Sequence, residues 1–599
     1  MDSQDLSLQP RNWTLAVAYG LAVLTFAWAM SNVPLIATPY GTYDDALFVR
    51  GAINFLSGRW LGPYDNMTLA KGPVYPIWVA MAWMSGLPLL VAQGLAYALA
   101  LVVLVRGLRP WLWSEPSAYF LFLILLFNPA TYAIGQLRVM REGLYVPLTI
   151  FILALLVWWM RWRTQPLAHR ALAAVVTGLV IGCYWCTREE GLWILPAVGA
   201  ALLRAADLNL RPVLAHVRTS KPARRLLAAE AGLLALIAAS ACGVTLGFGL
   251  INSRYYGIAD VVEFKQPEFL SAYGSLARIK DPAGPKHHVV ISHTGLEKAF
   301  DNSPALAELR PYFSGEGGRD WVNASCEYYQ VSPCDGDIRA RDFVWALRDA
   351  VATVGRHASA TEARAYYARV GAELAAACDG GRLDCLPPRR TMAPPFRFEF
   401  VGGTLREAKN GLAYILSLHV MDLVPAPMSC YIDDCGYDGR TWSLFLDVLN
   451  TNLFVPTPWI PPPVDLLRRS GNPADALPFE RRGAYVYAAL GKVVAAYRAL
   501  LPVLFTTSVL AYLLLGIYSL VIRRADPLFV IATLAGMVAA CRIVLMAYIE
   551  ASSLPAINSL YLSPIYPAVL LFVFVANLGV VRLLADAPWR TAIARLRGA

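Results

Sequence analysis

The feature that most constrains this chain is a series of uncharged apolar runs, each long enough to cross the roughly 30 Å hydrocarbon layer of a membrane. A membrane span must satisfy its backbone hydrogen bonds internally, so each run is expected to be a helix. Of the 599 residues, 57% are hydrophobic and 16% are charged, which is more apolar than a typical soluble domain. The sequence therefore predicts a polytopic α-helical membrane protein with about ten spans, at residues 13–30, 88–105, 117–134, 143–160, 171–187, 191–203, 231–252, 500–522, 528–549 and 559–581.

Basic residues in the short loops predict how these spans are oriented, because loops rich in Lys and Arg stay on the cytoplasmic side. When the spans alternate, these loops all fall on one side, so both termini are expected in the cytoplasm. Topology then explains the formal net charge of +10, and no nucleic-acid partner is expected. No small-residue cleavage site follows the first span, which predicts a retained anchor. The basic residues concerned are Arg106, Arg109, Arg161, Arg163, Arg170, Arg204, Arg211, Arg218, Lys221, Arg224, Arg225, Arg523, Arg524, Arg582, Arg590, Arg595 and Arg597.

The distribution of apolar runs divides the chain into three parts. The middle part has only short apolar runs and is long enough for a folded domain with its own core, which is expected to be mixed in structure. Two of its stretches, 342–358 and 361–381, have apolar positions at helical spacing. The predicted parts are a transmembrane module over 1–252 with its first external loop at 31–87, an external domain over 253–497, and C-terminal spans with a cytoplasmic tail over 498–599.

Six of the ten cysteines form close pairs inside the external block. Disulfides persist in oxidising compartments, so this placement agrees with the topology. Three local disulfides are expected; a zinc site is the alternative, but the spacings are wide for the usual zinc motifs. His287, His288 and His293 are expected in a solvated loop rather than at a metal. The expected pairs are Cys326 with Cys334, Cys378 with Cys385, and Cys430 with Cys435.

Charged residues collect where spans begin or end on the external side. For any one of them, the simplest interpretation is an interfacial charge that reaches water or caps a helix. Several acidic groups, each with a cation nearby at a depth where charge is costly, instead indicate a site. Arg542 lies inside a span, about 10 Å below the outer surface at the helical rise, and needs an anionic partner. The other clusters are Asp44 and Asp45 with Lys71; Arg138, Arg141 and Glu142; and Arg188, Glu189 and Glu190.

These residue types suit one reaction at a boundary between lipid and water. A carboxylate can take the proton from an acceptor hydroxyl, while Lys and Arg can neutralise a phosphate leaving group. The pattern therefore favours transfer of a sugar from a lipid-phosphate donor. A single displacement needs one base and a stabilised leaving group, so this chemistry requires no cofactor. The adjacent carboxylates Asp44 and Asp45 are the candidate ligands if a divalent cation, Mg or Mn, takes part.

Short motifs within residues 10–250 carry a family resemblance. They are "YDDALFVRGAINFLSG" followed by "KGP", then "RVMREGLY", and then "TREEGLW". Together they resemble the GT-C fold glycosyltransferases that use polyprenyl-phosphate sugars, a superfamily that includes protein O-mannosyltransferases and the aminoarabinose transferase of lipid A. Gly72 and Glu189 depart from the family pattern, because each stands where the family has a proline. The external block resembles no acceptor-binding domain.

The resemblance implies roles for individual residues. Asp44 matches the catalytic base, and Asp45 matches the acidic neighbour that orients the acceptor or binds a metal. Lys71 matches a lysine that contacts the donor phosphate, and Glu142 and Glu190 match later acidic positions. The further candidates for the donor phosphate are Arg138, Arg188 and Arg542; for Arg542, an acidic residue of another span is the alternative partner.

The expected function is that of an inverting glycosyltransferase, with a hexosyl or pentosyl donor on polyprenyl phosphate and a glycan, lipid or protein acceptor. The expected place is a bacterial inner membrane, with the site facing the periplasm. One alternative is a transporter or flippase, but its sites would lie near the bilayer midplane between repeated halves. A second alternative is a receptor or scaffold, in which the acidic clusters at the membrane edge would be idle.

Overall fold

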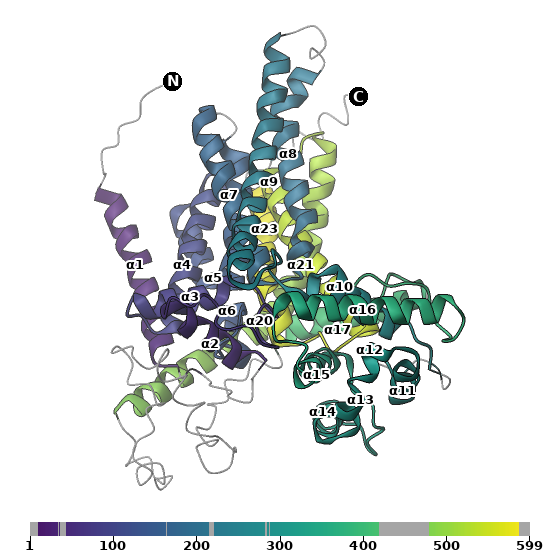
Figure 1. Ribbon diagram of the computed structural model, residues 1–599. Helices are drawn as coiled ribbons and strands as arrows, with labels where there is room; N and C mark the ends of the chain where they lie inside the picture. Colours follow the sequence, from purple (N-terminus) through teal and green to yellow (C-terminus); the bar gives the residue numbers. More distant parts are fainter. Residues whose placement is uncertain are drawn as a thin grey trace.

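The protein is described by a computed structural model, which covers residues 10–585 apart from 34, 36–42, 163–164, 215–220, 282–283, 285, 287 and 419–477. Within these residues the regular structure is helical. Extended pairing there is limited to two isolated bridges, Ile279 with Cys385 and Val289 with Arg339. Figure 1 shows a bundle of long helices and, beside one of its ends, a domain of shorter helices. This domain and this end of the bundle are named external and outer after their predicted side of the membrane, which stays a prediction.

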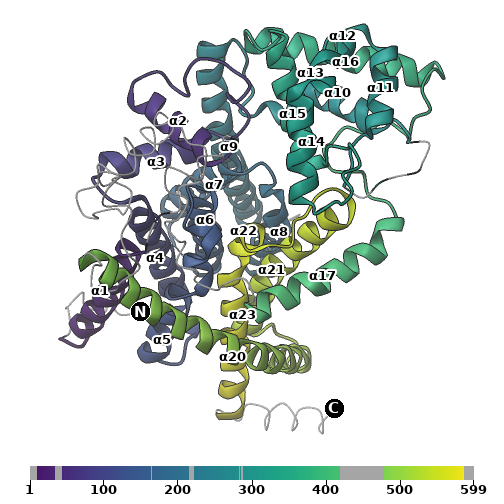
Figure 2. The same ribbon diagram turned by 90° about the horizontal axis from the view of Figure 1, so that it is seen from below.

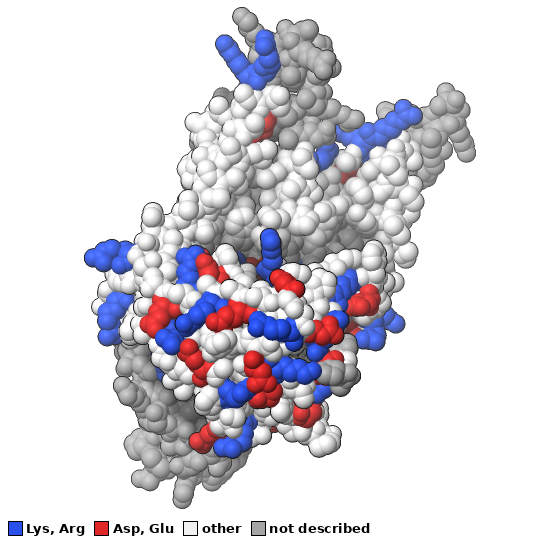
Figure 3. Space-filling view, turned by 45° about the vertical axis from the view of Figure 1, so that its right-hand side comes forward, with Lys and Arg blue, Asp and Glu red and all other residues white. Residues whose placement is uncertain are grey.

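Eight of the described helices are long and apolar enough to cross a membrane. They confirm the predicted fold class of a polytopic α-helical membrane protein. Figure 3 shows the side of the bundle as a largely white surface, with the charged residues gathered on the external domain and at the far end. The eight helices are α1 (Pro10–Ser31), α4 (Leu89–Leu108), α6 (Glu142–Arg161), α7 (Leu167–Thr187), α9 (Lys221–Tyr256), α20 (Pro478–Val521), α21 (Pro527–Ser552) and α23 (Tyr566–Ala585).

The predicted span at 117–134 is interrupted. Helix α5 (Glu115–Leu126) has only 12 residues and ends before Pro129. A residue that precedes proline is disfavoured in a helix, and the side chain of Asn128 accepts a hydrogen bond from the Ala130 backbone at 3.1 Å, which starts a new turn. The other elements of the bundle are the short η1 (Arg109–Trp111), η2 (Pro129–Tyr132), η3 (Ile134–Gln136) and η5 (Gly191–Ile194), and the 20-residue α8 (Leu195–Leu214). The last two stand where a span was predicted at 191–203.

Short helices cover the end of the bundle that faces the external domain (Figure 2). Two of them come from the first external loop and pack together through Phe48 and Val49 against Tyr75 and Val79. Helix α20 runs through the predicted boundary at 497–498 and contains Pro502. It changes direction along its length (Figure 2), and a proline inside a helix removes a hydrogen bond and favours such a bend. The short elements at this end are α2 (Asp45–Leu56), α3 (Val74–Met84), α22 (Ser559–Leu562) and η8 (Ser563–Ile565), and the longer α17 (Glu399–Ser417) lies there as well.

The external domain has a hydrophobic core of its own, which includes Phe269, Phe343 and Leu374. It was predicted to be mixed, but its described residues are helical, because its apolar residues recur at helical spacing. The two helices predicted there, at 342–358 and 361–381, are confirmed as α15 and α16. The elements of the domain are η6 (Glu263–Lys265), α10 (Pro267–Ala277), α11 (His293–Asn302), α12 (Pro304–Ala307), α13 (Arg310–Ser314), α14 (Glu316–Tyr328), α15 (Ala340–Thr353) and α16 (Ala360–Asp379).

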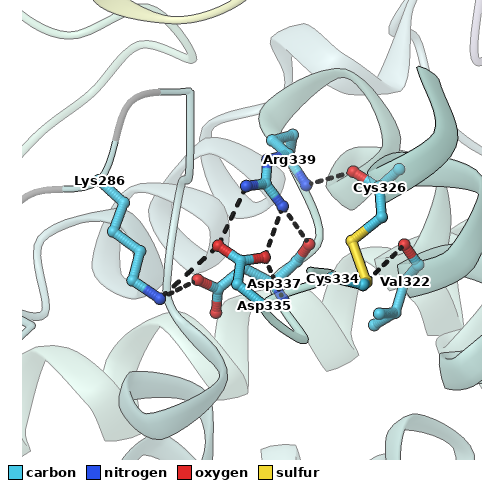
Figure 4. The surroundings of a disulfide bond; sticks show 8 residues. Lys286, Val322, Cys326, Cys334, Asp335, Asp337 and Arg339 are labelled. Atoms are coloured by element: carbon cyan, nitrogen blue, oxygen red, sulfur yellow. Dashed lines mark hydrogen bonds and ion pairs between the residues drawn. A yellow bond between two sulfur atoms is a disulfide. The ribbon is translucent and has the colours of Figure 1, made fainter. Parts of the chain in front are cut away.

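Disulfides close short loops of the external domain. Figure 4 shows the bridge from Cys326, in the last turn of α14, to Cys334, which precedes a group of ion pairs. In that group, Arg339 pairs with Asp335 at 2.7 Å, and Lys286 also contacts the carboxylates nearby. Two of the three predicted disulfides are confirmed, and the third lies outside the described residues: the pairs are Cys326 with Cys334 and Cys378 with Cys385, and then Cys430 with Cys435.

Removal of the first bridge is expected to destabilise the external domain by about 2.5 kcal/mol, because a crosslink restricts the unfolded chain. Cys334→Ser should therefore lower the thermal midpoint of the protein in detergent. Cys242→Ser is the matched control, since Cys242 is an exposed free cysteine in α9. Equal midpoints for Cys334→Ser and the unaltered protein, measured without reductant, would contradict the expectation.

Candidate functional site

A cavity of about 390 Å³ lies where the outer end of the bundle meets the external domain. Its wall on the membrane side includes Asp44, Lys71 and Arg188, which follow or precede membrane-associated helices. The external domain and the segment after it supply the opposite wall. The residues of that wall that matter below are His288, Arg341, Trp345 and Arg389.

Asp44 and Lys71 form an ion pair in this wall. Asp44 is the residue before α2, yet its side chain does not cap that helix. The Lys71 ammonium lies between the rings of Phe48 and Trp345, at 5.4 and 5.5 Å from their centroids. The side chain of Lys71 is 9% exposed and that of Asp44 is 39% exposed. Of the two predicted residues, the carboxylate is therefore the more accessible to a ligand in the cavity.

Gly72 explains one departure from the family pattern. A Cβ at this position would lie 1.9 Å from the carbonyl oxygen of Cys186, at the end of α7. Only a residue without a side chain allows so close an approach between the two backbones. The glycine therefore lets the backbone beside Lys71 lie directly against the end of α7, two residues before Arg188.

Asp45 and Arg138 are paired with each other outside the lining of the cavity. The Asp45 side chain is fully buried, and the Arg138 guanidinium donates to its two oxygens at 2.5 and 3.3 Å. The backbone nitrogen of Val139 donates to it as well, at 3.2 Å. The pair thus joins the start of α2 to the segment before α6, while the roles predicted for both residues stay predictions.

The other charged residues of the membrane edge form a network of buried ion pairs. Arg141 pairs with Glu189 at 2.6 Å, which explains the acidic residue that replaces the proline of the family. Arg188 contacts both Glu142 and, at 2.6 Å, Glu190. Hence the loop after α7 and the start of α6 each supply a cation and a carboxylate, and the resulting ion pairs hold them together.

Arg542 of α21 joins the same network. Its guanidinium lies 3.4 Å from Glu190 and donates to the carbonyl of Tyr561 at 2.9 Å. The ring of Trp193 lies under it, 5.4 Å from the guanidinium carbon. The partner of this buried arginine is therefore an acidic residue that follows another span, and Arg542 does not line the cavity.

Charge and burial shift the pKa values of the groups outside the spans. Burial lowers the pKa of Lys71 well below its usual value, and the nearby positive charge of Arg141 lowers it further. Burial also lowers the pKa of Arg188, to about 10. Burial alone would raise the pKa of Glu190, but Arg188 and Arg542 outweigh it and lower that pKa to about 2. Glu190 is therefore a carboxylate at neutral pH.

The wall contributed by the external domain is also basic. Arg341 pairs with Asp342 at 2.9 Å, whereas Arg389 donates to the carbonyl of Thr391 and has no ion pair among the described residues. Across the whole cavity, six basic side chains face two acidic ones, Asp44 and Glu142. Clefts lined by one sign of charge attract ligands of the opposite sign, so the cavity suits an anion.

Sequence reasoning missed this second wall, because its residues belong to no motif. His288 was expected in a solvated loop, but it is 8% exposed and its Nε2 lies 2.8 Å from the carbonyl of Glu550 in α21. Arg389 lies in a proline-rich segment whose only sequence signal is that of a linker. Their position depends on how the domain packs on the bundle, which spacing along the chain does not reveal.

The carboxylates of Asp44 and Asp45 do not fit a shared divalent cation. Each already contacts a basic side chain, and only Asp44 lines the cavity. In the part of the chain that the structure describes, no group of three His, Cys, Asp or Glu residues is arranged to hold a metal ion. The prediction that no metal is required stays a prediction.

Glu190→Gln is expected to lower the free energy of unfolding by about 3 kcal/mol at neutral pH, because it leaves the buried Arg542 without a carboxylate and removes one of the two carboxylates that contact Arg188. The folded-state pKa of Glu190, about 2, lies below the ordinary value of 4.5. Its contribution is therefore complete above the ordinary pKa and is lost as the pH falls toward the folded-state pKa.

The measurement is the thermal midpoint of the variant and of the unaltered protein, from neutral pH down toward the folded-state pKa of Glu190. The difference should be large at neutral pH and shrink as the pH falls. Glu399→Gln is the control, since Glu399 is 61% exposed and pairs with Arg397 on the surface, where a pair contributes about 0–1 kcal/mol. Equal midpoints for the two variants would contradict the prediction.

Comparison with known proteins gives structural similarity only. No family model and no curated protein matches the chain. Similar solved structures are ArnT from Cupriavidus metallidurans in the apo state (12% identity, 91% of this chain and 78% of that chain, TM-score 0.33), and the same protein bound to undecaprenyl phosphate (13%, 97% and 80%, TM-score 0.31). Another is the arabinosyltransferase EmbB from Mycobacterium smegmatis (15%, 83% and 42%, TM-score 0.32). Similarity at this level transfers no family, activity or residue role to this chain.

Proposed function

We propose that this protein is an integral-membrane inverting glycosyltransferase that moves a sugar from a polyprenyl-phosphate donor to an acceptor hydroxyl at the outer face of the membrane. The observation that carries the proposal is the Asp44–Lys71 pair in the wall of a basic cavity at the end of the bundle. A base and a cation side by side are what a single displacement from a phosphate requires. The site would face the periplasm of a bacterial inner membrane, with both termini in the cytoplasm.

The donor phosphate would bind on the membrane side of the cavity. Lys71 and Arg188 line that side, as does Arg141, which the sequence did not single out for this role. A polyprenyl chain remains in the lipid, so its phosphate reaches a site at the membrane edge without leaving the bilayer. Arg138 and Arg542 are paired with carboxylates outside the cavity lining, so the phosphate contacts are assigned to the other three.

The reaction is a single displacement at the anomeric carbon. The acceptor O–H bond breaks and its proton passes to the carboxylate of Asp44. The acceptor oxygen forms a bond to the anomeric carbon while the bond from that carbon to the phosphate oxygen breaks on the opposite face. The electron pair leaves with the phosphate, so polyprenyl phosphate is released and the configuration of the sugar inverts. Basic side chains near the leaving oxygens stabilise the charge that develops there.

The two alternative functions require other sites. A transporter would bind its substrate near the bilayer midplane, whereas this cavity lies at the end of the bundle and is lined by the external domain. A receptor or scaffold would have no use for a base beside a cation in a cavity. The position and chemistry of the cavity therefore favour the transferase.

Asp44→Asn is expected to reduce turnover at least about a hundredfold, because an amide cannot accept the proton of the acceptor. The measurement is release of polyprenyl phosphate by the purified, lipid-reconstituted protein from a panel of polyprenyl-phosphate sugars. Asp384→Asn is the matched control, since Asp384 is 76% exposed and pairs with Lys280 on the external domain. Near-normal turnover by a folded Asp44→Asn variant would exclude Asp44 as the base.

Donor affinity is expected to fall as the pH rises from neutral to alkaline. Burial lowers the pKa of Lys71, and a bound phosphate raises it again because an opposite charge favours the ammonium. Donor binding therefore takes up a proton and weakens when Lys71 loses its charge. Lys71→Arg should flatten this pH dependence between neutral pH and about pH 9, because an arginine holds its proton more strongly than a lysine; above that range Arg188, with its pKa of about 10, begins to lose its own charge. The same slope of donor affinity against pH in both proteins would show that Lys71 does not contact the donor.

A further inference from the structure

One face of α15 in the external domain reaches the loop that carries Asp44 and Lys71. Trp345, Arg348 and Asp349 lie three and four residues apart, so they share that face of the helix. Trp345 lines the cavity, whereas the Arg348 side chain is fully buried. These side chains hold the loop at two places, one directly before Asp44 and one a few residues before Lys71.

The first place is Tyr43, directly before Asp44. Its hydroxyl donates to an oxygen of Asp349 at 2.5 Å. Its ring lies 5.2 Å from the ring of Trp321 and 4.8 Å from that of Trp345, measured between centroids. The side chain of Tyr43 is thus fixed by a charged hydrogen bond and by two aromatic contacts, all from the external domain.

The second place lies shortly before Lys71. Asn66 donates from its side chain to the other oxygen of Asp349 at 2.5 Å. The guanidinium of Arg348 donates to the backbone carbonyls of Asn66, at 2.6 Å, and of Thr68, at 3.3 Å. The positive charge of Arg348 is paired with the carboxylate of Glu263, at 2.5 Å. The backbone on this side of the loop is therefore held by a buried arginine whose own position is fixed.

Asp349 joins the two places. Its two oxygens accept from Tyr43, from Asn66 and, at 3.2 Å, from the indole nitrogen of Trp321. A carboxylate that accepts three hydrogen bonds orients its donors relative to one another. The side chain of Asp44 does not cap α2, but its carbonyl accepts from the backbone nitrogen of Phe48 at 3.1 Å. Among the described residues, the contacts of Tyr43 therefore hold the chain on the side of Asp44 away from the helix.

We infer that Tyr43 and Asp349 are positioning residues, through which the external domain sets the geometry of the Asp44–Lys71 pair. The inference rests on the proposed function and adds to it a role for the domain. The external domain then completes the active site on the bundle, in addition to any contact it makes with the acceptor. A displacement of the base by about 1 Å can cost a factor of about a hundred in rate, so small changes at this contact should be visible in kcat.

Tyr43→Phe keeps the ring and removes the hydroxyl, and Asp349→Asn keeps the shape and removes the charge. Each is expected to lower kcat about tenfold or more, with the donor KM within about twofold, because the phosphate contacts remain. Tyr366→Phe is the matched control. The hydroxyl of Tyr366 donates to the carbonyl of Ala305 inside the same domain, at 2.7 Å, so its loss should leave kcat unchanged.

A double variant separates positioning from a general loss of folding. If Tyr43 acts through Asp44, then Tyr43→Phe should have no further effect on the residual rate of Asp44→Asn, because residues that act as a unit are not additive. If Tyr43 only supports the fold, the two losses should multiply. A kcat within twofold of normal for both Tyr43→Phe and Asp349→Asn, or losses that multiply, would overturn the inference.

Hydrogen exchange tests the contact without any assay of activity. In Tyr43→Phe, backbone amides of 43–48 and 66–71 are expected to exchange faster than in the unaltered protein, while Tyr366→Phe should leave them unchanged. If no donor is turned over by the unaltered protein, the proposed function fails, and exchange still reports whether the contact holds the loop. Unchanged exchange in Tyr43→Phe would overturn the inference on its own.

Discussion

The outer end of this bundle depends on ion pairs whose arginines are closed to water. Arg188 and Arg542 are almost fully buried and share the carboxylate of Glu190. Transfer of such charges from water costs several kcal/mol each, and only close opposite charges offset it. Since the partners come from the loop after α7 and from α21, those two elements can meet in few arrangements. The charge pairing therefore fixes the wall of the cavity on the membrane side more tightly than apolar packing could, because apolar contacts are not directional.

The cavity needs both layers of the protein. The bundle supplies the wall on the membrane side, with Asp44 and Lys71, and the external domain supplies the opposite wall, with Trp345 and Arg389. The close approach at Gly72 fixes the loop against the bundle, while hydrogen bonds from α15 fix it against the domain. A loop held from both sides is more ordered than a loop held from one, which is what a reaction between precisely placed groups requires.

The sequence revealed the parts of this site that depend on local pattern. Long apolar runs predicted the spans, helical spacing predicted α15 and α16, and the depth of the acidic clusters predicted a site at the membrane edge. It did not reveal the partners. Arg542 and Glu190 are 352 residues apart, and nothing in spacing distinguishes Asp44, which lines the cavity, from Asp45, which is buried against Arg138. Which of two adjacent carboxylates faces the cavity is decided by the turn at the start of α2, a property of the fold.

The ion pairs at the outer end of the bundle limit how a donor phosphate can bind. Each predicted cation there already contacts a carboxylate, so a phosphate can bind only by sharing or replacing one of them. Of the carboxylates in these ion pairs, Asp44 is the most exposed, and its partner is Lys71. A phosphate that draws Lys71 toward itself weakens the contact with Asp44 and leaves that carboxylate free to accept a proton. In this scheme the arrival of the donor prepares the base, because one lysine serves the resting carboxylate and the leaving group in turn.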